Sequence, residues 1–274
     1  MQNNNDSSKI LTIKNHLEKM WQDYCQLNPQ ALIIYQALSA KNKYIANDHI
    51  ALRTLQHPKL GIQSLAKHFE KFGYKSCGEY QFVEKKLFAL HFENAIDPSL
   101  PKIFISELIL SKMSIQTQNV FDQILSAFSN DFTNSENFPY SGIYWDINYK
   151  TYLELANESE YASWFYAFGF RPNHFTVSIN HLDQTQDINK LNEFIKSLGI
   201  KLNNSGGEVK GTPEELLEQS STMANHIEVS FTDGQFKIPA CYYEFAKRYP
   251  LKNGQLYQGF IAKSADKIFE STNR

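Results

Sequence analysis

A short apolar run headed by a histidine occurs twice in the chain, at residues 47–53 and again at residues 172–178. Successive side chains of a strand point to opposite faces, so each run predicts a strand with distinct faces. The face that carries the histidine consists of His49, Ala51 and Arg53 in the first run and of His174, Thr176 and Ser178 in the second. The two histidines, 125 residues apart, therefore begin two similar strands.

A helical pattern follows each histidine strand and stops at a glycine. Apolar residues recur at three- and four-residue intervals over 65–72 and over 191–198, and Gly73 and Gly199 come next. Glycine is favoured just beyond a helix end, because it adopts left-handed backbone angles without steric cost. The repeat of strand, helix and glycine predicts two related modules.

The remaining periodicity completes both modules. In the first we expect a strand at 49–54, a helix at 62–72, and strands at 74–84, 87–93 and 103–108. In the second we expect a strand at 174–180, a helix at 188–198, a strand near 207–210, a short helix opening at Thr212-Pro213, and strands at 226–231 and 236–245 joined by an Asp233-Gly234 turn. The pattern predicts an α+β protein with two paired βαβββ modules and additional helices.

Helical segments flank and join the modules. Residues 10–45 predict helices that pack on the first module, residues 111–168 are mostly helical with a break at 133–142, and residues 251–274 return to an amphipathic helical pattern. The predicted division is an N-terminal helical arm at 1–45, a first module at 46–110, a helical connector at 111–170, and a second module with its C-terminal helix at 171–274.

Composition and charge narrow the class of protein. Apolar residues make up 42% of the chain and aromatic residues 14%, as in a globular protein. A net charge of −2 without a basic stripe argues against nucleic acid and against an anionic membrane as partners. No apolar stretch reaches the ~20 residues of a membrane span, and residues 1–9 resemble neither a signal peptide nor an anchor. The three scattered cysteines form no disulfide framework, and a reducing cytoplasm is the predicted location.

The last strand of each module carries a carboxylate between apolar neighbours, Glu107 in the first and Glu244 in the second. A charge buried in an apolar strand is costly unless it is paired or binds a metal. If the two histidine strands lie side by side, His49 and His174 converge and one of these carboxylates completes a three-ligand set. Two imidazoles and one carboxylate are typical of non-haem Fe(II) sites, which keep positions open for a chelating substrate and O₂.

Other roles for these side chains are also consistent with the sequence. A histidine on a strand is commonly a hydrogen-bonded core residue, and either glutamate can be a solvated residue at a sheet edge. His181 and His226, near the strands of the second module, are the alternative ligands.

Arg53 lies on the face of His49, four residues along the same strand, and is one of only four arginines in the chain. The planar guanidinium binds a carboxylate through two parallel hydrogen bonds, so this position suits an organic acid substrate. The alternative is a structural salt bridge with Asp48 or Glu107.

Several segments together resemble the 2-oxoadipate dioxygenase/decarboxylase (hydroxyglutarate synthase) family, which is related to the vicinal-oxygen-chelate superfamily of paired βαβββ modules. The matching segments are Asn47-Asp48-His49-x-x-x-Arg53, Asn173-His174-Phe175-Thr176, Lys210-Gly211-Thr212-Pro213, Gln219-Ser220-Ser221-Thr222, Tyr243-Glu244-Phe245-Ala246-x-Arg248 and Ile268-Phe269-Glu270-Ser271. The resemblance implies a curved sheet around a metal site and an Fe(II)-dependent conversion of 2-oxoadipate and O₂ to D-2-hydroxyglutarate and CO₂, a step of lysine catabolism.

The resemblance also implies roles for single residues. By this resemblance His49, His174 and Glu244 are the metal ligands and Arg53 is the partner of the substrate carboxylate. Phe260-x-x-x-Ser264-Ala265 resembles the segment that supplies a substrate-contacting serine, and Lys263 stands where the lysine-degrading enzymes carry an apolar residue. The chain is also shorter than those enzymes and is similar to a compact branch that includes plant proteins. A lyase or isomerase with a divalent metal, and a non-catalytic binding module, are the alternative functions.

Overall fold

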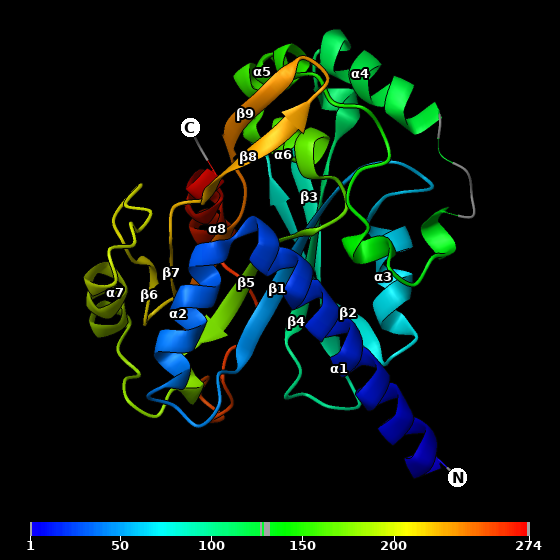
Figure 1. The fold of residues 1–274 in the computed structure, drawn as a ribbon. Helices are drawn as coiled ribbons and strands as arrows, with labels where there is room; N and C mark the ends of the chain where they lie inside the picture. Colours follow the sequence, from blue (N-terminus) through cyan, green and yellow to red (C-terminus); the bar gives the residue numbers. More distant parts are fainter. Residues whose placement is uncertain (1, 127, 129–131, 273–274) are drawn as a thin grey trace.

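Two four-stranded modules share one eight-stranded sheet in the computed structural model, which describes residues 2–126, 128 and 132–272. The strand order is β2-β3-β4-β1-β5-β10-β7-β6, and the two halves meet between β1 and β5 (Figure 1). The four predicted segments span the whole chain, and Met1 and residues 127, 129–131 and 273–274 of these segments lie outside the described residues. None of the described helices is both long enough and apolar enough to cross a membrane.

The first module follows the predicted order. It consists of β1 (Asn47–Leu55), α3 (Ile62–Glu70), β2 (Tyr74–Phe82), β3 (Leu87–Asn94) and β4 (Lys102–Leu108). Strand β4 pairs with β1 in parallel, and β3 and β2 follow in antiparallel pairs. Gly73 just beyond α3 has a φ of 95°, the left-handed conformation that glycine adopts without strain. The β-α-β-β-β prediction is confirmed for this half.

The second module repeats the arrangement with an insertion. Its elements are β5 (Pro172–Ser178), α7 (Ile188–Ser197), β6 (Lys210–Thr212), β7 (Leu217–Ser221) and β10 (Tyr242–Arg248). Strand β10 pairs with β5 in parallel, as β4 does with β1, and β7 and β6 follow in antiparallel pairs. Gly199 beyond α7 has a φ of 79°. The two modules are therefore topological copies.

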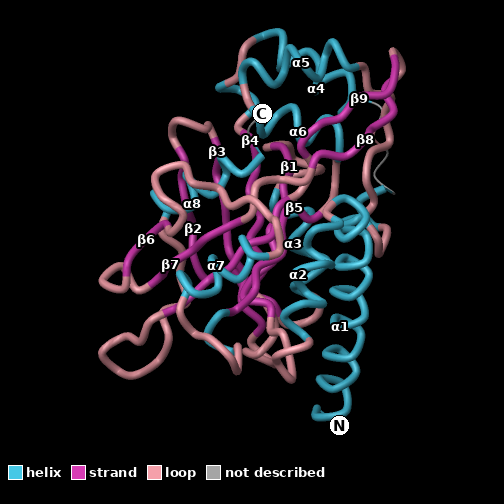
Figure 2. Tube along the Cα trace, turned by 60° about the vertical axis from the view of Figure 1, so that its left-hand side comes forward, coloured by secondary structure: helices cyan, strands magenta, loops and turns pink. Residues whose placement is uncertain are grey.

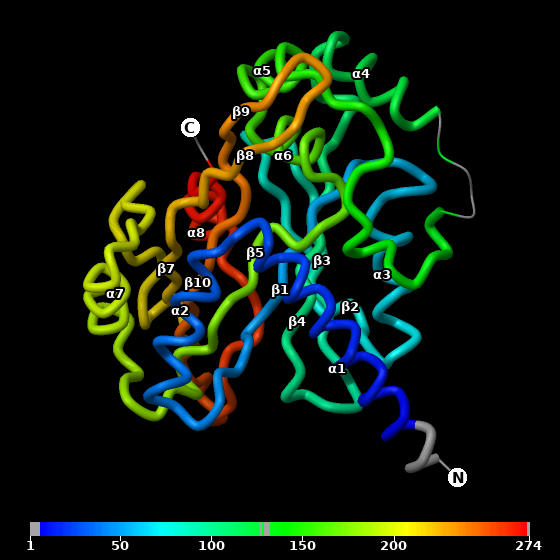
Figure 3. Tube along the Cα trace, in the orientation of Figure 1, coloured from blue at the N-terminus to red at the C-terminus, as the bar shows by residue number. Residues whose placement is uncertain are grey.

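Two predictions for the second module are wrong. The short helix expected at Thr212-Pro213 is the turn of the β6–β7 hairpin, although the backbone N–H of Glu215 does donate to the Thr212 hydroxyl. The expected strand at 236–245 is two strands, because β9 (Gly234–Pro239) pairs only with β8 (His226–Phe231) and β10 begins at Tyr242. The β8–β9 hairpin lies beside α5 (Tyr149–Glu158), as Figure 3 shows. The Phe236 ring of β9 stacks on the Tyr149 ring of α5, with 3.7 Å between the centroids.

The N-terminal helices α1 (Gln2–Leu27) and α2 (Pro29–Ser39) lie together along one side of the sheet (Figure 2). They were expected to pack on the first module, but α1 contacts both modules. His16 approaches Phe72 of the first module at 5.6 Å, whereas Trp21 packs on Phe175 of β5 at 5.1 Å. The Tyr24 hydroxyl donates to the backbone carbonyl of Tyr242 in β10. Helix α1 therefore covers the junction of the modules.

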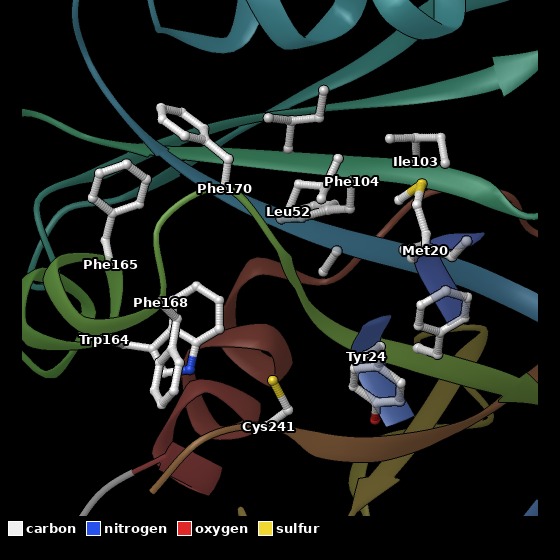
Figure 4. Packing of buried hydrophobic residues seen from close by; sticks show 14 of the residues in the cluster. Met20, Tyr24, Leu52, Ile103, Phe104, Trp164, Phe165, Phe168, Phe170 and Cys241 are labelled. Carbon is white, nitrogen blue, oxygen red and sulfur yellow. The ribbon is translucent and has the colours of Figure 1, made fainter. Parts of the chain in front are cut away.

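The connector and the tail supply the remaining cover. The connector contains α4 (Ile115–Ser126), α5 and α6 (Glu160–Phe168), and Figure 4 shows Trp164, Phe165 and Phe168 from α6 turned into the buried cluster. The C-terminal helix is shorter than predicted: α8 covers Ala262–Ile268, and a 3₁₀ turn, η5, covers Phe269–Thr272. In the loop between β10 and α8, the Phe260 ring contacts Tyr80 of β2 and Phe104 of β4.

Glu158 at the end of α5 caps the start of α4. Its carboxylate accepts hydrogen bonds from the backbone N–H of Ser114 at 2.7 Å and from the hydroxyls of Ser114 and Thr117 at 2.6 Å. Desolvation alone would raise the pKa of Glu158, but these hydrogen bonds lower the pKa to about 2.

Glu158→Gln is therefore expected to lower the free energy of unfolding by about 1 kcal/mol at pH 7, the usual contribution of a helix cap. The carboxylate binds its proton more weakly in the folded state, so its contribution is present above pH ~4.3 and is lost as the pH falls toward 2. Urea denaturation at pH 7 and pH 3 measures the effect, with the exposed Glu154→Gln on the same helix as the control. An equal difference between Glu158→Gln and wild type at both pH values would contradict this account.

Candidate metal centre

Three metal-ligating side chains converge at the junction of the modules. His49 comes from β1, His174 from β5 and Glu244 from β10, and one ligand atom of each lies within 4.8 Å of the other two. Glu244 Oε2 is 3.2 Å from Nε2 of His174, and Glu244 Oε1 is 3.5 Å from Nε2 of His49. All three side chains are buried.

The register of the strands brings these residues together. In the antiparallel β1–β5 pair His49 lies opposite Thr176, and in the parallel β5–β10 pair Glu244 lies opposite the same Thr176. His174, two residues before Thr176, points to the same face. Neighbouring strands are about 4.8 Å apart, so three side chains on one face of adjacent strands reach a common point.

Each histidine is oriented by the residue that precedes it. Nδ1 of His49 lies 2.8 Å from Oδ1 of Asp48, and Nδ1 of His174 lies 3.1 Å from Oδ1 of Asn173. An ionised carboxylate oxygen or an amide oxygen can only accept a hydrogen bond, so Nδ1 is the donor in both rings and Nε2 keeps its lone pair. This second hydrogen bond is the usual way in which proteins fix a metal-binding imidazole.

Asp48 is itself held by a buried ion pair across the two modules. Arg248 of β10 donates from Nε and Nη2 to the two carboxylate oxygens at 2.7 and 2.8 Å. Burial alone would raise the pKa of Asp48, but the Arg248 guanidinium holds it well below its usual range. Nη1 of Arg248 also donates to the carbonyls of Tyr257 and Gly259, which ties the loop after β10 to the site.

The charge state of the three ligands favours a cation. Burial lowers the pKa of both histidines, so both rings are neutral, as a metal requires. Burial also raises the pKa of Glu244 to about 8, although a 2.6 Å hydrogen bond from Gln219 opposes the shift. Within the described residues, Glu244 forms no ion pair with a lysine or an arginine. A divalent cation would supply the missing positive charge, so the donor set fits a metal.

A small cavity of about 20 Å³ adjoins the three ligands. Its remaining wall is mostly apolar and consists of Phe104, Gln219, Tyr242, Phe260, Ala265, Ile268 and Phe269. The Phe260 ring lies edge-on to His49 with 4.8 Å between the centroids. The loop, α8 and η5 thus close the site from the side opposite the sheet.

Arg53 lies at the edge of this site but already has protein partners. Its Nη1 donates to Glu160 at 2.6 Å and its Nη2 to the Thr272 hydroxyl at 3.3 Å. The guanidinium also lies over the rings of Tyr161 and Trp164 at 4.7 and 5.0 Å. The salt bridge considered as the alternative does form, but its partner is Glu160 and not Asp48 or Glu107.

The sequence profile of the 2-oxoadipate dioxygenase/decarboxylase family matches residues 5–136 and 141–258 of this chain. The chain belongs to the 2-oxoadipate dioxygenase/decarboxylase family. It is 36% identical to the chloroplastic 2-oxoadipate dioxygenase/decarboxylase of Arabidopsis thaliana over 97% of this chain and 80% of the relative.

Two solved structures are similar to this 2-oxoadipate dioxygenase/decarboxylase family member over nearly their whole lengths. One is the Oryza sativa hydroxyglutarate synthase in complex with 2-oxoadipate, at 34% identity and a TM-score of 0.88, with 98% of this chain and 93% of that chain covered. The other is a protein of Shewanella frigidimarina, at 49% identity and a TM-score of 0.87, with 91% and 98% covered.

The structure places the other sequence candidates of this family member away from the three ligands. Glu107 accepts hydrogen bonds from the backbone N–H of Ile62, at the start of α3, and from Gln56. His181 pairs with the Ser178 hydroxyl, and His226 is exposed.

The tail candidates are also outside the cavity wall. Lys263 is exposed. Ser264 is buried beside Gly211, so close that a Cβ atom added to this glycine would lie 3.2 Å from the Ser264 hydroxyl oxygen. Their neighbours Ala265 and Ile268 contribute to the wall instead.

Sequence reasoning assigned no role to the residues that orient the ligands and line the cavity, although Gln219 and Phe260 are in segments that carry the family resemblance. A signal was present for two of them, because Asp48 and Asn173 are oxygen-bearing residues immediately before the repeated histidines. For Gln219, Tyr242 and Phe260 no local pattern indicates proximity, since they come from three different segments.

A second group of metal-ligating types, Cys77, His91 and Glu93, occurs in the first module. There both ring nitrogens of His91 are already paired, with Tyr80 at 2.9 Å and with Glu93 at 3.0 Å.

Proposed function

We propose that this protein is an Fe(II)-dependent dioxygenase/decarboxylase that converts 2-oxoadipate and O₂ to D-2-hydroxyglutarate and CO₂. The observation that carries the proposal is the buried set of His49, His174 and Glu244 in a chain so similar to the rice enzyme solved with 2-oxoadipate. The reaction balances without an external reductant, because the substrate carbon chain supplies the electrons that reduce O₂.

The proposal assigns the metal to three side chains. Nε2 of His49, Nε2 of His174 and the Glu244 carboxylate would hold Fe(II). Fe(II) held by two imidazoles and one carboxylate would supply Lewis acidity toward a 2-oxo acid and would mediate the transfer of electrons from the substrate to O₂.

The remaining task of the protein is to orient groups and to exclude water. Asp48 and Asn173 fix the two imidazoles, and Gln219 fixes the carboxylate by donating to its Oε1. The aromatic wall formed by Phe104, Phe260 and Phe269 keeps the cavity apolar, which strengthens electrostatic interactions within it. Arg53 is the group proposed to face the substrate carboxylate that is remote from the metal.

Substrate entry requires part of the wall to move. The cavity of about 20 Å³ can hold about one water molecule, which needs roughly 10–15 Å³. A six-carbon diacid is several times larger. The sheet is continuous on one side, so the Phe260 loop, α8 and η5 are the elements proposed to shift when the substrate binds.

The test is anaerobic reconstitution with Fe(II), followed by O₂ uptake with 2-oxo diacids of four to seven carbons. The expected result is one CO₂ released for each O₂ consumed, with 2-oxoadipate as the preferred substrate. Turnover without O₂ uptake would instead identify a divalent-metal lyase or isomerase. A substrate-dependent rise in melting temperature without any turnover would identify a binding module.

Three further points stay predictions from the sequence. They are a role in lysine catabolism, a cytoplasmic location and the absence of nucleic acid or membrane partners. The two plant relatives are named as plastid proteins, so their location does not test the cytoplasmic one.

A further inference from the structure

Two residues of the cavity wall, Tyr242 and Gln219, each have a polar side-chain atom without a hydrogen-bond partner among the described residues. Tyr242 begins β10, is fully buried and lines the cavity. Its ring stacks on the metal-ligand candidate His174, with 4.6 Å between the centroids and 25° between the planes. The Tyr242 hydroxyl has no partner among the described residues. A buried hydroxyl without a partner is costly, so a ligand group is expected to satisfy it.

Arg53 carries a second donor of the same kind. Glu160 and Thr272 occupy Nη1 and Nη2, but Nε has no hydrogen-bond partner in the part of the chain that the structure describes. Phe269 lines the cavity and lies 5.7 Å from the Arg53 guanidinium. A shift of η5, which carries Phe269, would therefore expose Arg53 to the cavity.

The register of the sheet orders these groups along one direction. His49 and Glu244 both lie level with Thr176, whereas Tyr242 and Ala51 both lie level with His174. Arg53 is two residues beyond Ala51 on the same face of β1. Two residues of a strand span about 6.6 Å. Along the strand direction, Tyr242 is one such interval and Arg53 two such intervals from the level of His49 and Glu244.

This order matches the shape of a 2-oxo diacid. In a six-carbon diacid, four carbon–carbon bonds of about 1.5 Å separate the keto carbon from the remote carboxylate carbon. With the 2-oxo end at the metal, the remote carboxylate falls at about the level of Tyr242, and the long side chain of Arg53 can reach it from the next level along β1. A phenol and a guanidinium are both hydrogen-bond donors, as a carboxylate requires.

We propose that the Tyr242 hydroxyl binds the remote carboxylate of the substrate together with Nε of Arg53, and so selects diacids over 2-oxo monoacids. This inference rests on the proposed function. The other unpartnered polar atom in the cavity is Oε1 of Gln219, whose amide nitrogen is engaged by Glu244. That oxygen is an acceptor and would repel a carboxylate, which leaves Tyr242 as the donor of the wall.

The variant that tests the proposal is Tyr242→Phe, which keeps the ring against His174 and removes only the hydroxyl. Tyr243→Phe is the matched control, because the Tyr243 hydroxyl is equally buried and has no partner among the described residues, whereas its ring packs against Trp21 on the other side of the sheet. The ligands are 2-oxoadipate and 2-oxohexanoate, which has the same chain length without the remote carboxylate. Calorimetric binding to the Zn²⁺-substituted protein and steady-state O₂ uptake with Fe(II) are measured.

Tyr242→Phe is expected to weaken 2-oxoadipate binding and raise its KM by about 10- to 100-fold, the effect of losing a hydrogen bond to a charged group. Binding of 2-oxohexanoate and iron content should be unchanged, and the melting temperature should not fall. Tyr243→Phe should match wild type in ligand binding, iron content and O₂ uptake. Equal affinity of wild type and Tyr242→Phe for the diacid would overturn the inference, as would a parallel loss for both ligands. If wild type binds the diacid with the expected preference but consumes no O₂, the proposed reaction fails while the role of Tyr242 stands.

Discussion

Glu244→Gln abolishes Fe(II) binding and O₂ uptake if the proposed centre is correct. The substitution keeps the shape of the side chain and leaves an oxygen to accept the hydrogen bond from Gln219, but it removes the charge that a cation needs. The loss of metal affinity should exceed the about 10- to 100-fold that removal of an outer hydrogen-bond partner costs. Metal content after anaerobic dialysis and O₂ uptake with 2-oxoadipate measure the effect.

The same substitution is not expected to destabilise the metal-free protein. Glu244 is 1% exposed, and burial of a carboxylate without a cationic partner is unfavourable. The melting temperature of Glu244→Gln in a chelating buffer should equal or exceed that of the wild-type protein. The matched control is Glu107→Gln, a buried carboxylate on the last strand of the other module, which should keep the metal. Wild-type iron content in Glu244→Gln would refute the ligand assignment.

Arg248→Met is expected to lower the free energy of unfolding by about 3–5 kcal/mol, as when one partner of a buried ion pair is removed. The substitution leaves the Asp48 carboxylate buried without its counter-charge. It also frees the carbonyls of Tyr257 and Gly259, which Arg248 holds in the loop over the site. Urea denaturation of the metal-free protein at pH 7 gives the value.

A second variant separates charge from packing. The double variant Asp48→Asn with Arg248→Met no longer buries an unpaired charge, so it should recover part of the lost stability. Its His49 ring still has a side-chain oxygen at position 48 as an acceptor for Nδ1. A loss below about 1 kcal/mol in Arg248→Met would show that the pair contributes little to folding.

Local patterns predict the first module well because its strands β2, β3 and β4 pair with one another in chain order. Strands β2, β3 and β4 are joined by short connections, and apolar residues mark their buried faces. In the second module the β8–β9 hairpin interrupts this order. The Asp233-Gly234 turn indicates the hairpin correctly, but the sequence does not reveal that it packs on Tyr149 of α5 and not in the main sheet.

The wrong helix at Thr212 shows how a tertiary ladder overrides a local signal. The helix-start pattern is present, and the expected hydrogen bond to the Thr212 hydroxyl forms. Pairing of β6 with β7 nevertheless closes the segment into a hairpin, in which Gly211 and Leu216 adopt φ values of 79° and 65°. Strand β7 is in turn held in the main sheet by its pairing with β10, a long-range contact that a single-segment argument does not include.

The sequence by itself determined the two histidine strands and the faces of their side chains, because alternation along a strand is a local property. Only the tertiary structure decided which carboxylate joins them. In the parallel pairs, Glu107 is level with Thr54, which faces away from His49, whereas Glu244 is level with Thr176, which faces the site. The residue of the first module that corresponds to Glu244 is Phe104, which lies level with Ala51. Both modules have a glutamate on their last strand, so the pairing register of the strands leaves the centre with one carboxylate.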